Sequence, residues 1–310
     1  MMNIVTLTLN PAFDRHCHIA DFATGHEFLA ADTQMDAGGK GVNISRALTV
    51  NGVDNQAVIV VGDRNAAAFC EQLDEVGMTY RTVTVAGRIR ENLTIHTDTG
   101  EETRIAFTGF SVDRAVLDRV AEMTKPWMTT DTVVTLTGRM PQGASMDDLQ
   151  TLIADLKSCG ARVVIDSRSF TKDDLVAARP WLIKPNQEEI SMYLNRSVDG
   201  FDDALAGARE LCAAGIEQVM VSLGEQGAML VTADKTYVAT APRVTVRSTV
   251  GAGDSSIAGF LSAVKEGCTP DVCLARAIAF GSAACETAGT MPPTPDAVVR
   301  LIKDVTITTV

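Results

Sequence analysis

The residues best suited to do chemistry lie in one glycine-rich stretch, Gly251-Ala252-Gly253-Asp254. Its glycines let the backbone turn tightly, and the residues that follow, up to Lys265, carry apolar side chains at helical spacing. The first N–H groups of a helix have no partner within it, so they can bind a phosphate or a developing oxyanion. The carboxylate of Asp254 then either caps the helix or takes a proton from a hydroxyl that attacks a phosphoryl group.

Two common glycine-rich nucleotide motifs are absent from the sequence. The dinucleotide-binding fingerprint needs a glycine three places after Gly253, where the chain has Ser256. The pattern Gly-x-x-x-x-Gly-Lys-Ser/Thr of P-loop proteins does not occur either. The stretch therefore matches neither type of site, and a nucleotide-dependent oxidoreductase is disfavoured.

Gly-Ala-Gly-Asp at the start of a helix near the C-terminus resembles the ribokinase-like (PfkB) carbohydrate kinases. In that family the turn is the anion hole and the aspartate is the catalytic base. The resemblance implies these roles for the amides of residues 251–253 and for Asp254, with ATP as phosphoryl donor and Mg²⁺ as cofactor. Ser248, where much of the wider family has aspartate, resembles the branch that acts on phosphosugars.

A second glycine-rich segment, Gly-Gly-Lys-Gly-Val-Asn at residues 38–43, leads into another expected helix. Adjacent glycines let a ligand approach the backbone, although a flexible loop before a helix would look the same. The resemblance implies that this segment lines a sugar pocket. It also assigns sugar hydroxyls to an aspartate in Thr-Leu-Asn-Pro-Ala-Phe-Asp at residues 8–14, which could otherwise be a turn residue. The residues so assigned are Asp14, Gly38, Gly39, Lys40 and Asn43.

The polar stretch after Asp14 carries three histidines, His16, His18 and His26. Close histidines suggest a metal site, but no acid or cysteine falls at ligand spacing beside them. The pair His26-Glu27 also lacks the second histidine of a zincin motif, because residue 30 is alanine. We therefore predict no metal site in this stretch.

Gly-Arg-Ile-Arg-Glu-Asn at residues 87–92 places two arginines at alternate positions of an expected strand, so that both face the same way. A guanidinium group matches the geometry of phosphate, although an exposed strand edge can also carry arginines. The resemblance favours phosphate, because the phosphosugar branch uses an arginine here to bind the phosphate already on the sugar. Arg139 departs from the family pattern and is a further candidate. The predicted contacts are Arg88, Arg90, Asn92 and Arg139.

The resemblance spreads the nucleotide site over several later segments. The Asn-x-x-Glu motif at residues 186–189 matches one that organises Mg²⁺ and its waters around the phosphates, while a plain first-turn glutamate is the alternative. Magnesium keeps several of its waters, so one or two acids are sufficient. The predicted metal residues are Glu189 and Asp166. The predicted nucleotide contacts are Lys184, Asn186, Ser222, Gly224, Gly227, Thr249 and Ser282.

The 310 residues are 46% hydrophobic and 21% charged, and the formal net charge is −12. This acidic excess argues against nucleic acid or an anionic membrane surface as a partner. Seven cysteines without a Cys-x-x-Cys pair fit reduced thiols. The N-terminal run has no basic leader, and no apolar run reaches about 18 residues. We therefore expect a cytoplasmic protein.

The elements that must position these residues alternate between strand and helix, with one exception. Three segments, 82–85, 92–97 and 103–107, alternate apolar and polar positions, which predicts antiparallel ribbon. We expect a three-layer ribokinase-like α/β fold, with a mostly parallel sheet in one kinase domain over residues 1–310. The resemblance implies a small discontinuous β lid, from about 11–36 and 87–108, and a homodimer formed through it.

The expected reaction transfers the γ-phosphoryl group of ATP to a primary hydroxyl of a sugar phosphate. Fructose 1-phosphate is the favoured substrate, because the Gly-Arg-Ile-Arg and Gly-Lys-Gly segments resemble those of kinases that act on it. Tagatose 6-phosphate and fructose 6-phosphate stay open, since one sequence does not fix how the sugar lies in the pocket. A catalytically silent sensor of sugar phosphates is the more remote alternative.

Overall fold

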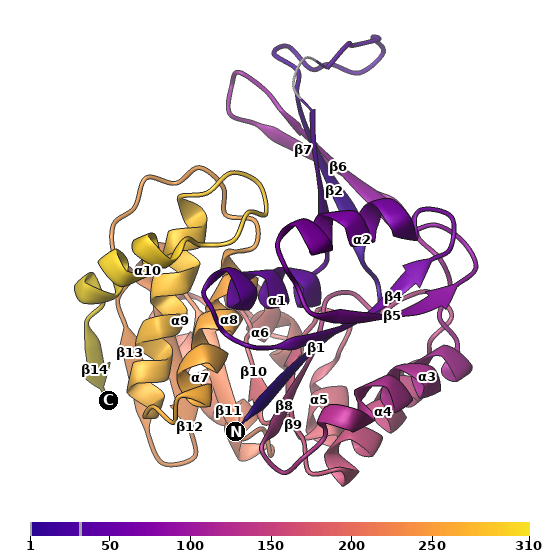
Figure 1. The fold of residues 1–310 in the computed structure, drawn as a ribbon. Coiled ribbons are helices and arrows are strands. Elements are labelled where there is room, and N and C mark those ends of the chain that lie inside the picture. The colour runs from indigo at the N-terminus through magenta and orange to yellow at the C-terminus, as the bar shows by residue number, and fades with distance from the viewer. Residues whose placement is uncertain (1, 31–32) are drawn as a thin grey trace.

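The computed structural model describes residues 2–30 and 33–310, and in this part of the chain ten strands form one large sheet (Figure 1). They are β1 Asn3–Thr8, β4 Gln56–Gly62, β5 Tyr80–Val85, β8 Thr132–Thr137, β9 Arg162–Asp166, β10 Leu182–Ile183, β11 Gln218–Ser222, β12 Ala228–Thr232, β13 Thr236–Ala239 and β14 Ile307–Thr309. Their order across the sheet is β14-β13-β12-β11-β10-β9-β8-β1-β4-β5.

Neighbouring strands from β5 to β11 run parallel, and β12 to β14 add an antiparallel edge. Parallel strands need cover on both faces, which explains their runs of buried valine, leucine and isoleucine. Successive side chains accordingly enter two separate cores: Ile4 and Met220 face one, while Val5, Val219 and Val221 face the other. The expected three-layer, mostly parallel α/β fold is confirmed.

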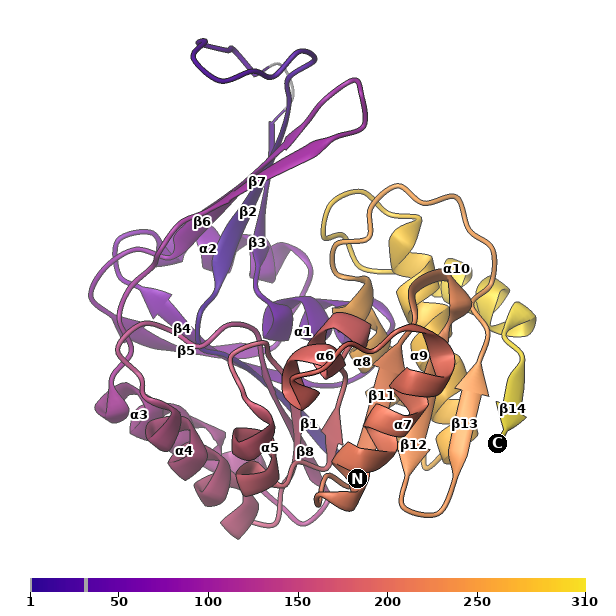
Figure 2. The same cartoon turned by 180° about the vertical axis from the view of Figure 1, so that it is seen from behind.

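Helices cover both faces of the sheet (Figures 1 and 2). One face packs against α1 Lys40–Val50, α8 Ala252–Lys265, α9 Pro270–Cys285 and α10 Pro295–Leu301. The other packs against α3 Arg114–Thr124, α4 Met146–Ser158, α5 Lys172–Ala178, α6 Gln187–Leu194 and α7 Gly200–Ala213. The remaining helices are α2 Ala66–Glu75 and the short 3-10 helices η1 Lys125–Trp127, η2 Gly224–Gln226 and η3 Ile302–Asp304. No helix within residues 2–30 and 33–310 is both long and apolar enough to cross a membrane.

A smaller sheet projects from the main body (Figures 1 and 2). Its strands are β2 Ala12–His18, β3 Thr33–Gly38, β6 Arg90–His96 and β7 Glu102–Ala106, in the order β3-β2-β6-β7. β2 runs parallel to β6, whereas the two outer pairs are antiparallel. The prediction of a small discontinuous second sheet is confirmed. Residues 31 and 32, which fall in the predicted segment 11–36, lie outside the described residues.

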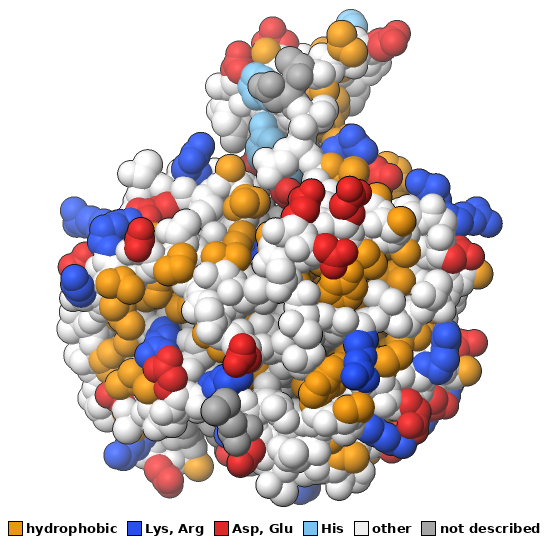
Figure 3. Space-filling model, in the orientation of Figure 1, with side chains coloured by type: hydrophobic (Ala, Val, Ile, Leu, Met, Phe, Trp, Pro, Cys, Tyr) orange, Lys and Arg blue, Asp and Glu red, His pale blue; other side chains and the backbone are white. Residues whose placement is uncertain are grey.

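One face of the small sheet is polar and the other is apolar. Side chains alternate between the faces along each strand, and the register places polar residues opposite polar ones and apolar residues opposite apolar ones. The polar face carries Asp14, His16, Asp36, Arg90, Asn92, His96, Glu102 and Arg104. The apolar face carries Phe13, Cys17, Leu93, Ile95 and Ile105. Histidine and acidic side chains gather over the projecting sheet in Figure 3.

Two expectations about local structure are wrong. Residues 82–85 do not join the ribbon: they lie in β5, which pairs parallel with β4 at the edge of the main sheet. An edge strand with one exposed face shows the same alternation as a ribbon, so the pattern was ambiguous. Arg88 precedes the start of β6 in an exposed connection, so it does not share a strand face with Arg90. The alternative reading of Asp14 as a turn residue is also excluded, because it lies within β2.

Candidate active site

Asp254 lies in the first turn of α8, directly after the glycine-rich turn. Gly251 is the N-cap residue and has a φ of 82°, a left-handed conformation that favours glycine. Three residues beyond it, Asp254 is 6% exposed. The free amides of a helix N-terminus and a buried carboxylate thus share one site, as the sequence motif predicted.

The second glycine-rich segment holds this carboxylate in place. Asn43, in the first turn of α1, donates from Nδ2 to Oδ2 of Asp254 at 2.8 Å. Burial raises the pKa of Asp254 to about 6, although Lys40 opposes the change. A carboxyl with this pKa is ionised at neutral pH, yet it is basic enough to accept a proton from a hydroxyl in a transition state.

Asp166 joins two lysines that come from different predicted sites. Lys40 donates from Nζ to Oδ2 of Asp166 at 2.9 Å, and Nζ of Lys184 lies 3.8 Å from the same oxygen. Burial acts to raise the pKa of Asp166, but Lys184 and Lys40 outweigh it and hold the pKa below its ordinary value. A β-carbon on Gly253 would stand 3.0 Å from Nζ of Lys184, so this lysine lies over the glycine-rich turn.

Lys40, which the sequence predicts as a sugar contact, donates from its ammonium group to Asp166 in this structure. It also lies close enough to Asp254 to act on the pKa of that carboxyl. Together, Lys40, Lys184, Asp166 and Asp254 form a largely buried cluster with two positive and two negative charges. Asp166 therefore holds the ammonium groups of both lysines in position.

The polar face of the small sheet holds a second charged cluster. Asp14 is 7% exposed and accepts from Nδ2 of Asn92 at 2.7 Å. Arg90 donates from Nη1 to Oδ1 of Asn92 at 2.9 Å, and Nη2 of Arg104 lies 3.6 Å from Oδ1 of Asp14. Burial lowers the pKa of Arg90, and the like charges of Arg139 and Arg104 act in the same direction. Arg104 and Arg139 thus lie near enough to Arg90 to act on its charge, and such a group of guanidinium side chains suits an anion.

Sequence reasoning missed Arg104, because residues 103–107 were interpreted only as ribbon. The available signal was alternation: Arg104 lies opposite Thr94, two residues along the same face from Asn92. Arg139 is exposed in the bend after β8, near enough to affect the pKa of Arg90. Arg88 makes no side-chain hydrogen bond or ion pair to this cluster in the part of the chain that the structure describes, and it is exposed.

Two glycines allow the backbone between β3 and α1 to lie close to Asp14 and Thr8. A β-carbon on Gly38 would overlap the carboxylate of Asp14. Gly39 has a φ of 118° and is the N-cap residue of α1, and a β-carbon on it would stand 2.9 Å from the side chain of Thr8. Glycine is therefore required where β3 passes into α1.

A cavity of about 1240 Å³ adjoins the N-terminus of α8. It is lined by six of the predicted nucleotide residues, Asn186, Ser222, Gly224, Gly227, Thr249 and Ser282, and also by Ala252 and Gly253. Val244, Val246 and Ile278 supply apolar wall. Sequence reasoning gave these three no role, since isolated apolar residues look the same in a pocket and in a core. The size and mixed lining suit a nucleotide.

Asn186 and Glu189 form a capping box at the start of α6: the Asn186 side chain accepts from N–H of Glu189 at 2.8 Å, and Glu189 accepts from N–H of Asn186 at 3.1 Å. Glu189 also accepts from Nε of Arg168 at 3.0 Å. Within the described ranges, no three His, Cys, Asp or Glu residues converge on a metal position. Direct Mg²⁺ ligation by Asp166 does not fit its pairing with two lysines. Glu189 does not line the cavity, and its two carboxylate oxygens are already engaged by N–H of Asn186 and by Arg168, so the only contact that fits it is one through the waters of a hydrated Mg²⁺.

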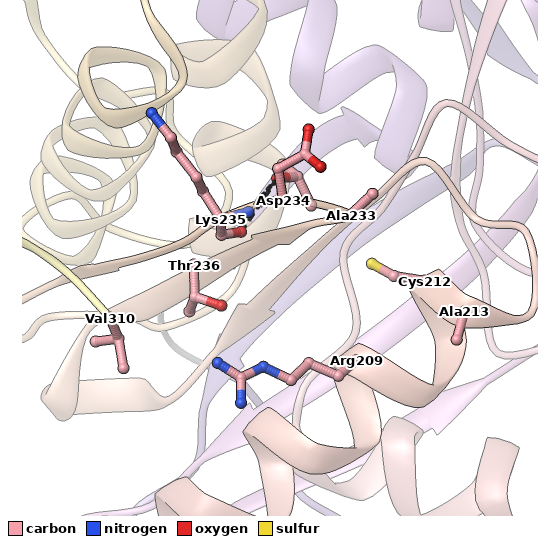
Figure 4. Close-up of a pocket in the computed structure, with 9 residues that line it drawn as sticks. Arg209, Cys212, Ala213, Ala233, Asp234, Lys235, Thr236 and Val310 are labelled. Atoms are coloured by element: carbon pink, nitrogen blue, oxygen red, sulfur yellow. Dashed lines mark hydrogen bonds between the residues drawn. The ribbon is translucent and has the colours of Figure 1, made fainter.

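A smaller cavity of about 430 Å³ lies between the end of α7 and the turn that joins β12 to β13 (Figure 4). Arg209, Cys212, Lys235 and Val310 are among the residues that line it. The side chains of Arg209 and Lys235 point in different directions in Figure 4. None of the predicted site residues lines this cavity, and it takes no part in the site around Asp254.

Residues 10–297 match the family model described as pfkB family carbohydrate kinase. The 1-phosphofructokinase of Escherichia coli (strain K12) is 33% identical over 261 residues, which cover 83% of this chain and 83% of that protein. The 1-phosphofructokinase of Xanthomonas campestris pv. campestris is 32% identical over 303 residues, with coverage of 96% and 95%. The crystal structure of phosphofructokinase-2 from Escherichia coli in complex with potassium matches with a TM-score of 0.90 at 27% identity, covering 98% of this chain and 99% of that chain.

Proposed function

The chain belongs to the PfkB family of carbohydrate kinases, and from this premise we propose that it phosphorylates fructose 1-phosphate to fructose 1,6-bisphosphate with ATP. It is a sugar phosphotransferase of the phosphofructokinase type. The 1-phosphofructokinase relatives support the choice of fructose 1-phosphate. The observation that supports phosphoryl transfer is the buried carboxylate of Asp254, which has a pKa of about 6 and stands at the helix terminus that borders the nucleotide-sized cavity.

In the proposed reaction, a primary hydroxyl of the sugar phosphate attacks the γ-phosphorus of ATP. The new oxygen–phosphorus bond forms as the bond from the γ-phosphorus to the bridging oxygen breaks, and ADP leaves with that oxygen. The hydroxyl proton passes to Asp254, which Asn43 holds in position at 2.8 Å. The base thus has its proton-accepting oxygen fixed before substrate arrives.

The negative charge of the transferred group is stabilised, in this proposal, by the amides of Gly251, Ala252 and Gly253. Lys184 lies over the same turn, and Asp166 orients both Lys184 and Lys40. Mg²⁺, when bound, supplies further charge neutralisation at the β- and γ-phosphates. Glu189 would hold that ion through its waters, with its own position fixed by Asn186 and Arg168.

The phosphate already on the sugar is assigned to Arg90, with Arg104 and Arg139 beside it. Arg90 has a partner at Nη1 in Asn92, while its buried Nε has no hydrogen-bond partner among the described residues. A phosphate oxygen can satisfy that N–H group. Sugar hydroxyls are assigned to Asp14 and to Asn43, whose buried Oδ1 likewise finds no partner within residues 2–30 and 33–310.

We extend the proposal to domain organisation: residues 1–310 act as one kinase domain, and the small sheet is a lid over the sugar. A lid of this kind excludes water and so limits hydrolysis of ATP. What supports the assignment is the polar face, which carries Asp14 and Arg90 on adjacent strands. The lid segments correspond to about 11–36 and 87–108, of which residues 31 and 32 lie outside the described ranges.

Release of ADP by the purified protein with Mg·ATP tests the function. We expect kcat/KM for fructose 1-phosphate to exceed that for fructose 6-phosphate and tagatose 6-phosphate by about tenfold or more, since one methylene or hydroxyl displaced in a pocket typically costs this much. Unphosphorylated fructose should be poorer still. Preference for fructose 6-phosphate would favour the second candidate, a phosphofructokinase-2-like activity suggested by the matching structure. Binding without turnover would favour the sensor.

We also propose that the chain forms a homodimer through strand β7, at the edge of the small sheet. All residues of β7 are exposed, and Ile105 and Phe107 are 41% and 54% exposed. Apolar side chains beside an open strand edge favour pairing with a second copy. Ile105→Glu should give a monomer by light scattering, while Val299→Glu, at an exposed apolar residue of α10, should leave the dimer intact. A monomeric unmodified protein would refute the dimer.

A further inference from the structure

Three side chains on the polar face of the small sheet lie in a row of close polar contacts across three strands. Oε1 of Glu102, in β7, lies 3.2 Å from Nδ1 of His96, in β6. Nε2 of His96 lies 3.0 Å from Nδ1 of His16, in β2. The two rings are nearly parallel, with 18° between their planes, so each ring nitrogen meets its partner close to the ring plane.

The carboxylate at one end of this row favours one arrangement of the ring protons. Glu102 can only accept, so its contact favours a proton on Nδ1 of His96. In the neutral ring, Nε2 of His96 is then an acceptor, and Nδ1 of His16 must donate to it. Nε2 of His16 is left with a free lone pair. Burial lowers the pKa of His16, and His96 acts in the same direction; Asp14 and Asp36 oppose the change but do not outweigh it, which favours the neutral ring.

The free nitrogen of His16 is buried and has no hydrogen-bond partner in the described part of the chain. A β-carbon on Gly289, in the loop after α9, would stand 3.6 Å from this nitrogen and 3.5 Å from Oδ2 of Asp36. Gly289 therefore lies beside both acceptors, and its lack of a side chain leaves that side of them uncovered. The hydroxyl of Thr290, next in the loop, is also buried without a partner among residues 2–30 and 33–310.

The loop that contains Gly289 and Thr290 also lies beside the glycine-rich turn at the start of α8. The Cα of Thr290 lies 3.9 Å from the position of a β-carbon on Gly251, the first residue of the proposed anion hole. His16 is two residues from Asp14 on the same face of β2, so it adjoins the residue assigned to sugar hydroxyls. His16 and Gly251 therefore lie beside the same loop, at residues 289–290.

We propose that His16 is a further substrate-binding residue, whose Nε2 accepts a hydrogen bond from a hydroxyl group of the phosphosugar. Asp36 accepts from the same hydroxyl or its neighbour. His96 and Glu102 are positioning residues, because they act only by fixing the tautomer and orientation of His16. A polyol fits better than a metal ion, since no three metal-binding side chains converge within the described residues. The inference rests on the proposed function for the identity of the sugar.

Replacing His16 by phenylalanine keeps the ring but removes the acceptor. With the phosphosugar that the unmodified enzyme turns over, we expect KM to rise about tenfold, because a buried polar hydroxyl loses its partner. KM for ATP should stay unchanged. His18→Phe is the matched control: His18 lies on the same face of β2, is bonded to Asp98 and is 44% exposed, so its loss should leave both KM values unchanged.

Substrate analogues that lack one hydroxyl each identify the contact. The unmodified enzyme should lose about tenfold in kcat/KM with one of these deoxy sugars, and His16→Phe should lose nothing further with that analogue. His16→Gln, which retains an acceptor, should recover part of the loss, as should His96→Gln relative to His96→Phe. These conservative variants separate a lost contact from a local packing defect.

An equal KM in His16→Phe and His18→Phe would overturn the proposal. So would an equal loss for every deoxy analogue in His16→Phe and the unmodified enzyme. If fructose 1-phosphate is not turned over, the proposed function fails by that result alone. The histidine contact is then judged with whichever phosphosugar is the substrate, so the two failures can be told apart.

Discussion

Asp254→Asn should lower kcat by about a thousandfold or more, the largest effect expected from a single substitution in this protein. Asparagine keeps the size of the side chain but cannot take the hydroxyl proton. KM for ATP and for the phosphosugar should change little, because neither ligand depends on this carboxylate for most of its contacts. Steady-state ADP release measures kcat, and isothermal calorimetry shows whether both ligands still bind. An unchanged kcat would remove Asp254 as the base.

Asp271→Asn provides the matched control. Asp271 is also an acid in the first turn of a helix, α9, but it has no contact with Asn43 or the lysine cluster among the described residues. Its replacement should leave kcat within about twofold. A general effect of removing an acid from a helix N-terminus would instead appear in both variants.

Asp254→Asn should also change the pH dependence of the reaction. Because the pKa of Asp254 is raised to about 6, kcat/KM should fall about tenfold for each pH unit below that value as the base becomes protonated. In Asp254→Asn the residual rate should lose this dependence. A rate profile with its acid limb near pH 4 in the unmodified enzyme would show that burial does not tune this carboxyl.

Asp254→Asn should be more stable than the unmodified protein at neutral pH, although it is less active. The folded-state pKa lies above the ordinary value of 3.8, so the folded state prefers the neutral carboxyl. The ionised form therefore costs on the order of 3 kcal/mol above pH 6, and this penalty vanishes below about pH 4. Asp254→Asn should raise Tm at pH 8 and have little effect on Tm at pH 4.

Arg90→Ala should raise KM for the phosphosugar about a hundredfold, with a smaller change in kcat. Charge-assisted hydrogen bonds from arginine to phosphate are among the strongest polar contacts, and the half-buried position of Arg90 limits competition from water. Arg104 and Arg139 would recover part of the charge. Activity with unphosphorylated fructose should be unaffected, since no phosphate contact is lost. Equal losses with both sugars would mean that Arg90 supports the sheet rather than the phosphate.

Arg15→Ala is the control for Arg90→Ala, because it removes an arginine from the other face of the same sheet. Arg15 lies on β2 one residue after Asp14, so it faces the opposite side, where it lies 3.5 Å from Glu91. Its loss removes one positive charge from the sheet but none from the polar face. KM for the phosphosugar should therefore stay within about twofold.

The parts of the structure that depend on local sequence were predictable. The turn at Gly251 needs glycine because its φ is positive, and the capping box of Ser145 and Asp148 at the start of α4 is written in four consecutive residues. Buried parallel strands can also be predicted, because both of their faces must be apolar and the sequence therefore shows continuous hydrophobic runs. These signals were sufficient for the main sheet and for the site at α8.

The contacts between distant segments were not predictable in the same way. His16 and His96 are 80 residues apart, and Lys40 and Asp166 are 126 apart. Nothing in either segment indicates the partner, because a lysine after two glycines suits a sugar hydroxyl and a carboxylate equally well. The strand β5 was misassigned for a related reason: alternation reports one exposed face and does not say which sheet the strand joins.

The junction between the small sheet and α1 has a mechanical consequence. β3 ends at Gly38 and α1 begins at Lys40, so a single residue separates them. The first turn of α1 carries both Lys40 and Asn43, which contact Asp166 and Asp254. A tilt of the small sheet would therefore displace the first turn of α1, because only Gly39 separates the two elements. In the proposed reaction, binding of the sugar phosphate would in this way shift Asn43 and, through it, Asp254.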